Sequence, residues 1–163
     1  MADRYPGRIE IGGIMPAEVV DEFIDLIVET GGSLNDFGLP EATKESVHEA
    51  LQKDETLILC HDRAPWGEFE ALETFLTRHG ISFDRHSDAY AGLDGEMVSG
   101  RGHTTIWFYA AQNGSLLLDQ KQIMEILRHD SSDQERVAAI RKLAQPPEWT
   151  PLPPLHVQEK HHE

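Results

Sequence analysis

A chain of 163 residues, 39% of them hydrophobic, is long enough for one domain with a buried core, and this composition argues against wholesale disorder. Its 29 acidic and 14 basic residues give a formal charge of -15 at pH 7, which opposes direct binding to nucleic-acid phosphates or anionic lipid. A single cysteine, Cys60, excludes an internal disulfide and a zinc site built on several cysteines.

The chain begins with a predicted strand followed by an amphipathic helix. Residues 8–13 alternate apolar and polar side chains, which is typical of a strand with one buried face. Pro16 is placed to open a helix over residues 17–29, and Gly31 is placed to end it. The apolar residues at helical spacing in this segment are Val19, Val20, Phe23, Ile24 and Ile27.

A second, weaker helix is predicted over residues 40–52, before a buried strand at 56–60. This strand is a continuous apolar run, which favours a position in the middle of a sheet. Residues 68–79 again show helical spacing and stop at Gly80. A short third strand follows at 81–85.

The next region is predicted to be rich in turns and strands. Residues 87–102 contain four glycines, which indicates either a loop or a strand pair with an open turn. Residues 104–111 read as a strong strand. Asn113-Gly114 favours a tight turn into a hairpin partner at 115–118.

Two helices are predicted near the carboxyl end of the domain. Asp119 with Gln122 has the spacing of a helix start, and the helix is expected to run to about His129. Ser132 with Glu135 has the same spacing and starts the last helix. That helix must stop near residue 144, because Pro146 and Pro147 remove backbone donors and disfavour helix before them.

These elements predict an α/β fold, with α+β as the alternative: a mixed sheet of about five strands with helices packed on it. Two layers, or three lightly covered layers, would satisfy the pattern, and a ferredoxin-like topology is one candidate. We expect a single domain over residues 1–145 and a proline-rich arm over 146–163. The amino end lacks the apolar core of a signal peptide, and no apolar stretch approaches the roughly 20 residues that span a bilayer, so a cytoplasmic protein is expected.

The sharpest candidate for chemistry lies at the ends of strands 56–60 and 81–85. The polar side chains that follow these two strands are His61, Asp62, His86 and Asp88. If the strands are parallel neighbours, the four groups emerge at one sheet edge and could hold a divalent metal or supply a general base, with His103 in reserve. Against this, nine histidines are scattered through the chain without a metal-ligand spacing, and polar residues are ordinary at strand ends.

Cys60 is not expected to form a catalytic pair with His61, because neighbouring side chains of a strand point to opposite faces. A thiol at the end of an apolar strand usually behaves as a small hydrophobic group. We therefore expect Cys60 to be a structural residue.

The acidic residues are concentrated in the first half of the chain. Between Glu10 and Glu73 there are sixteen of them and three basic residues. The acidic side of helix 17–29 carries Glu18, Asp21, Glu22, Asp25 and Glu29. Such a row is usually the solvated side of a surface helix, but without intervening lysines it is also suited to contact a basic partner.

The carboxyl-terminal arm is the other partner-facing feature. Its prolines favour an extended conformation, and Pro151 with Pro154 has the loose spacing that aromatic grooves recognise. We expect Trp149, Leu152 and Leu155 to lie back along the domain or to dock on a second copy. The terminal histidines are interpreted as solvated residues or remnants of an expression tag.

Together these features favour a non-catalytic protein that binds a macromolecular partner through its carboxylate-rich helical face, with Trp149 adding apolar contact. A basic, nucleic-acid-binding protein is one candidate partner, because a row of carboxylates can imitate the charge of a nucleic-acid backbone. We expect no cofactor, no direct nucleic-acid or membrane binding, and leave open a homo-oligomer. The alternative is a small metal-dependent enzyme, hydrolase-like, at the strand ends. A domain that binds a small ligand, or that dimerises without catalysis, is the third hypothesis.

Overall fold

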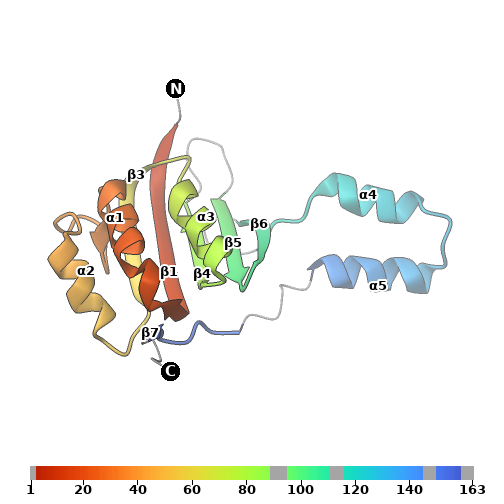
Figure 1. The fold of residues 1–163 in the computed structure, drawn as a ribbon. Helices are drawn as coiled ribbons and strands as arrows, with labels where there is room; N and C mark the ends of the chain where they lie inside the picture. The colour runs from red at the N-terminus through yellow and green to blue at the C-terminus, as the bar shows by residue number, and fades with distance from the viewer. Residues whose placement is uncertain (1–2, 89–94, 111–115, 145–149, 159–163) are drawn as a thin grey trace.

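The computed structural model describes residues 3–88, 95–110, 116–144 and 150–158. Figure 1 shows a twisted sheet with helices packed against it and a pair of helices that projects away from it. The strands are β1 (Arg4–Pro16), β2 (Ser33–Leu34), β3 (Leu57–Pro65), β4 (Ser82–Ser87), β5 (Gly95–Arg101), β6 (Thr104–Ala110) and β7 (Leu155–Gln158). The helices are η1 (Ala17–Val19), α1 (Val20–Thr30), α2 (Lys44–Leu51), α3 (Glu70–His79), α4 (Gln120–Arg128) and α5 (Asp133–Ala144).

The sheet is mixed, as predicted, and has the strand order β2-β3-β1-β4-β5-β6. β1 is antiparallel to both of its neighbours in this order, whereas β7 runs parallel to the last four residues of β1, from Gly13 to Pro16. The described residues form seven strands, where about five were expected. The ferredoxin-like candidate is confirmed for β1 to β4: α1 connects β1 to β2, α3 connects β3 to β4, and these four strands lie in the antiparallel order β2-β3-β1-β4. α2 is inserted between β2 and β3, and β5, β6 and β7 are additions to this βαββαβ pattern.

Helices α1 and α3 form where the apolar spacing predicted them. Each ends at a glycine in the left-handed conformation, Gly31 with a φ of 69° and Gly80 with a φ of 67°. A residue with a β-carbon would be strained there, so these glycines fix both helix ends. The buried side chains are Phe23, Ile24 and Ile27 on α1 and Leu72, Phe75 and Leu76 on α3.

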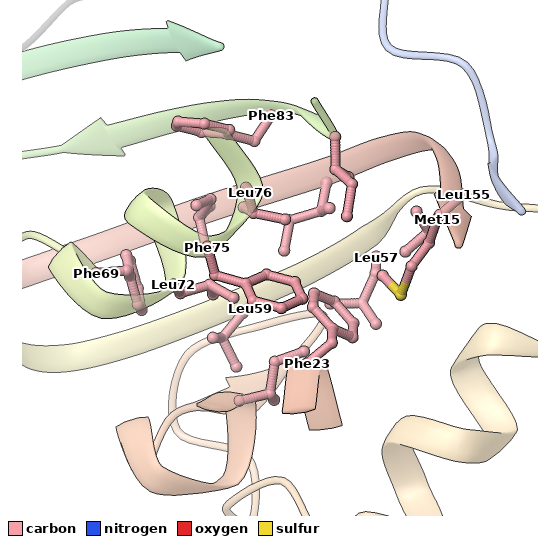
Figure 2. Packing of buried hydrophobic residues seen from close by; sticks show 14 of the residues in the cluster. Met15, Phe23, Leu57, Leu59, Phe69, Leu72, Phe75, Leu76, Phe83 and Leu155 are labelled. Carbon is pink, nitrogen blue, oxygen red and sulfur yellow. The ribbon is translucent and has the colours of Figure 1, made fainter. Parts of the chain in front are cut away.

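The core lies between these two helices and one face of the sheet (Figure 2). Ile9 and Ile11 of β1 are fully buried there, and their register partners on the adjacent strands include Leu59 and Phe83. Between the helices, the rings of Phe23 and Phe75 are 6.0 Å apart. We call this the helix-covered face of the sheet, and the opposite side the open face.

Helix α2 begins later than predicted, at Lys44 rather than at residue 40. Thr43 is its cap: its hydroxyl accepts from the amide of Ser46, and the Ser46 hydroxyl accepts from the amide of Thr43. Such a reciprocal cap satisfies two amides that the helix itself leaves unpaired, and it is the reason why the helix starts here.

The two helices after β6 start at the predicted residues. Asp119 accepts from the amide of Lys121, and Ser132 and Glu135 form the expected capping box. The expected strand partner at 115–118 is reduced to a bridge between Ala110 and Leu116, while the Asn113-Gly114 turn lies outside the described residues. In the part of the chain that the structure describes, no helix combines the length and apolar character needed to cross a membrane.

The proline-rich stretch returns to the body and ends in β7. The amide of Leu155 donates to the carbonyl of Glu55, and that of Gly13 donates to the carbonyl of Pro154. The Leu155 side chain enters the same core as α1 and α3, with 2% of its surface exposed. Leu155 is therefore buried in the core in the same way as Ile9 and Ile11 of β1, whereas the rest of β7 is exposed or partly exposed.

Candidate functional site

The five carboxylates predicted on the first helix are all exposed. They lie at Glu18, in η1, and at Asp21, Glu22, Asp25 and Glu29, in α1. Phe23, Ile24 and Ile27 occupy the buried side of the same helix, so its apolar and acidic residues separate as the helical period requires. These five residues are named the α1 acidic face below.

Helix α2 packs beside α1 and extends this negative surface. Its Glu45 and Glu49 are exposed, and Lys44 reaches across to Asp25 with a distance of 2.5 Å between Nζ and Oδ1. The hydrogen bond and charge of Asp25 raise the pKa of Lys44, and the charges of Asp21 and Glu45 add to this. Lys44 thus sits among carboxylates, and it is the only base within ion-pair distance of the α1 acidic face among the described residues.

A pocket of about 300 Å³ opens beside the carboxyl end of α1. It brings Glu29 of the α1 acidic face together with His61 of β3, which belongs to the metal-site hypothesis. Glu68 and Glu70, at the start of α3, and Arg4 also line it. Three carboxylates around one small hollow favour a cationic side chain over an anion.

Glu68 has an unusual environment in this pocket. Burial raises the pKa of its carboxyl above the ordinary value of 4.5, Arg85 opposes this shift, and the nearby charges of Glu96 and Glu73 add to it. A cation that binds beside Glu68 would stabilise its ionised carboxylate and so oppose the effect of burial.

Beneath the pocket lies a charged cluster that our sequence analysis missed. Arg85 of β4 points to the helix-covered face, where its guanidinium lies 2.9 Å from Glu73 and 3.1 Å from Glu96. It also donates to the carbonyl of Gly67 and to the hydroxyl of Ser87. The only signal in the sequence is an arginine at an inward position of a short strand, which alternation alone would have assigned to the core.

The structure does not bring the four strand-end residues together. β3 and β4 run in the same direction but are separated by β1, where His61 lies opposite Gly7 and His86 lies opposite Arg8. Because Gly7 and Arg8 are consecutive in one strand, the two imidazoles lie on opposite faces of the sheet. His61 accepts a hydrogen bond from the amide of Arg63 on the helix-covered side.

The remaining members of that hypothesis are also dispersed. His86 and Asp88 form a local contact on the open face, 3.6 Å apart, and Asp62 is exposed. His103 lies far from them in the fold, with its Nδ1 2.9 Å from the carbonyl oxygen of Thr77. Over residues 3–88, 95–110, 116–144 and 150–158, no three His, Cys, Asp or Glu side chains are placed to share a metal ion.

Cys60 is buried, as expected for a small apolar group at the end of a strand. Its register partner is Arg8, so its side chain points away from His61. Burial raises the pKa of the thiol, and the charge of Arg8 only partly opposes this. A thiol held in its protonated form is a poor nucleophile, which agrees with a structural role.

The last predicted contact residue, Trp149, lies outside the described residues. So do His161 and His162. Leu152 is partly exposed, and its β-carbon lies against Gly12 of β1. An apolar contribution from this arm to partner binding therefore stays a prediction.

A second surface that our sequence analysis did not single out lies on β6 and the helices after it. Ile106, Trp107 and Tyr109 are 47%, 49% and 43% exposed, and the rings of Trp107 and Tyr109 meet edge to face, 4.4 Å apart. Neither α4 nor α5 contains a buried residue. The signal was present as a run without charge from residue 104 to 118, which we interpreted only as strand propensity.

No protein-family model, curated protein or solved structure matches this chain. Two surfaces of the described chain stand out: the α1 acidic face with its adjoining pocket, and the apolar surface on β6.

Proposed function

We propose that the protein acts by non-catalytic binding of a basic protein through the α1 acidic face. One observation carries this proposal: among the described residues, the five exposed carboxylates on one side of this helix have a single base within ion-pair distance, Lys44. A surface that only keeps a protein soluble commonly mixes both signs. An uncompensated row instead creates a field that attracts a cationic partner over several ångströms.

The pocket beside α1 supplies a second element of recognition. Long-range attraction brings partners together, but affinity depends on a few well-packed anchors. A lysine or arginine of the partner that enters the pocket would meet Glu29 and Glu68 at once. A positive charge beside Glu68 would offset the cost of burying its carboxylate. The pocket therefore favours a cationic side chain of the partner over a neutral one.

The competing interpretation is that the α1 acidic face is only solvated. That interpretation gives no reason why the face should adjoin a pocket. Here Glu29 belongs to both. The protein is expected to act in the cytoplasm, because its only cysteine is free and buried, and a reducing compartment keeps such a thiol unpaired.

The test is a triple charge reversal, Glu18→Lys, Glu22→Lys and Glu29→Lys, which spares the Asp25 that pairs with Lys44. Wild type and variant are used as baits in host lysate at low and moderate salt. We expect the reversal to remove the basic proteins that the wild type captures. Capture by the wild type should weaken with salt, since about 0.1 M salt screens exposed charges beyond roughly 10 Å.

A matched control places the same three charge changes elsewhere, as Glu55→Lys, Asp62→Lys and Asp130→Lys, all at exposed positions. The control has the same net charge, so it should keep the partners if the position of the carboxylates matters. Equal capture by wild type and the α1 variant, or equal loss in both triple variants, would contradict the proposal.

A further inference from the structure

Strand β6 forms one end of the strand order, and its outer edge is only partly covered. The amide of Leu117 donates to the carbonyl of Tyr109, 2.9 Å away, and a bridge joins Ala110 to Leu116. Backbone groups of alternate residues in a strand point to the same edge. Thr105 and Trp107 therefore also turn their amide and carbonyl groups outward, where no strand pairs with them in the described part of the chain.

Part of this edge is covered, because residues 116–119, Gln122 of α4 and Leu143 of α5 line one hollow with residues 106–109. The strand itself lacks the other features that usually prevent strand-to-strand association. Natural edge strands carry a lysine, a proline or a bulge. β6 has the sequence Thr-Thr-Ile-Trp-Phe-Tyr-Ala, and its register with β5 is regular from Thr104 to Ala110. Its exposed side chains on the two faces of the sheet are Ile106 on one and Trp107 and Tyr109 on the other.

We propose that the protein forms a homodimer in which the β6 strands of two copies pair antiparallel across a twofold axis. An antiparallel pair of identical strands is self-complementary, so one edge serves both copies and the assembly closes at two. The two sheets then become one continuous sheet. This inference goes beyond the proposed function and uses a different surface of the protein.

The distribution of charge along the chain favours a second copy as the partner at this edge. Each copy carries a formal charge of -15, so two copies repel each other at most orientations. Residues 104–118 contain no Asp, Glu, Lys or Arg, although such residues make up 26% of the chain. Strand β6 therefore offers two copies a contact without like charges in the strand itself, and Asp119 is the one charged residue in the hollow beside it.

The register follows from the position of the unpaired groups. Thr105 and Trp107 lie symmetrically about Ile106, so the axis passes beside Ile106. Ile106 then lies opposite Ile106 of the second copy, and Thr105 exchanges backbone hydrogen bonds with Trp107 of that copy. The two Trp107 rings become diagonal neighbours at about 7–8 Å, within reach of aromatic contact.

The size of this contact sets the expected strength. The half-exposed side chains of Ile106, Trp107 and Tyr109 give on the order of 300 Å² of apolar surface per copy, judged from the 150–250 Å² of a buried aromatic residue. That is below the roughly 800 Å² per partner of a standard interface, so a weak dimer is expected, with a dissociation constant in the micromolar range.

Sedimentation equilibrium of the full chain over a range of roughly 1–300 µM tests the proposal, since this range brackets micromolar dissociation. Wild type should pass from monomer to dimer across it. Thr105→Pro removes an outward amide and leaves the ladder to β5 intact, so it should weaken dimerisation by at least about tenfold. Thr105→Ala keeps that amide and should behave as wild type.

A charge-pair experiment tests the axis itself. Ile106→Lys and Ile106→Glu each place two like charges opposite one another, so each variant alone should be monomeric, whereas an equimolar mixture should dimerise. Ile14→Lys, at another exposed isoleucine, 63% exposed on β1, is the control and should dimerise like the wild type. Circular dichroism and urea unfolding of each variant establish that it is folded.

A wild-type protein that stays monomeric at the highest concentration overturns the dimer. A dimer that survives both Thr105→Pro and Ile106→Lys overturns its location on β6. If the Lys and Glu variants are folded monomers that do not associate when mixed, the twofold register at Ile106 is wrong.

Discussion

The Nε atom of Arg85 lies 2.9 Å from Oε1 of Glu73, although the arginine side chain is only 3% exposed. This ion pair joins β4 to the first turn of α3, and Glu96 of β5 holds the other side of the guanidinium. Three consecutive elements, α3, β4 and β5, therefore meet at one buried charge. Such a charge is tolerated only while its partners are present.

Arg85→Ala is expected to destabilise the protein by about 3 kcal/mol, because it leaves Glu73 and Glu96 facing each other without a cation. Urea unfolding followed by circular dichroism measures the change. Arg8→Ala is the control, since Arg8 and Glu10 form an exposed pair 3.6 Å apart and should contribute no more than about 1 kcal/mol. Equal losses in the two variants would show that the buried cluster has no special role.

Glu68→Gln is expected to stabilise the protein at neutral pH. Burial raises the pKa of Glu68 in the folded state, so the folded protein favours the protonated form. The stability of wild type then falls as the pH rises from 4.5 through the folded pKa, and the glutamine variant avoids this loss. Unfolding at a series of pH values should give similar stabilities below pH 4.5 and a gap in favour of Glu68→Gln above it.

A constant difference between the two proteins at all pH values would contradict the assigned cause. Glu70→Gln is the matched control, because Glu70 lines the same pocket but is exposed. Its stability should follow that of the wild type across the same range.

Gly100→Ala is expected to destabilise the sheet by about 1–3 kcal/mol through overpacking. Gly100 lies opposite Phe83, and a β-carbon there would stand 2.3 Å from Cε1 of that ring. Phe83→Leu removes the ring that the new methyl group would meet. The loss of stability in the double variant should therefore be smaller than the sum of the losses in the two single variants. Strict additivity in thermal unfolding would refute a clash between these two positions.

Leu155→Ala is expected to cost about 2–5 kcal/mol, the range for emptying a buried leucine position. Leu155 belongs to the core that α1 and α3 cover, whereas Leu152 in the same stretch is partly exposed. Leu152→Ala is therefore the control and should cost clearly less. A loss of stability no larger than that of the control would mean that the end of the chain is only loosely attached.

Local patterns in the sequence were sufficient to predict most elements of this fold. The period of Val19, Phe23 and Ile27 fixed the buried side of α1, and glycines at 31 and 80 fixed the ends of α1 and α3. The exposure of the α1 acidic face follows from the same period, since one side of the helix must be polar if the other is buried. These features depend on residues within a few turns of one another.

Pairing between distant strands was not predictable in the same way. The residues around His61 and His86 carry no pattern that predicts β1 between their strands. The register is equally hidden, because a shift of one residue moves a side chain to the other face of the sheet. The metal-site hypothesis required β3 and β4 to be adjacent strands, and strand order is decided only by hydrogen bonding between distant parts of the chain. The Arg85 cluster was missed for the same reason, since its carboxylates come from α3 and β5.

The sequence by itself determined the helices, their acidic and apolar sides, and the negative charge of the surface, because these follow from composition and short-range periodicity. Tertiary structure alone decided which strands are neighbours, that β6 forms an edge of the sheet, and that Glu29, His61 and Glu68 share a pocket. The physical reason is that packing and strand pairing join residues far apart in the chain. Their choice depends on the free energy of the whole core.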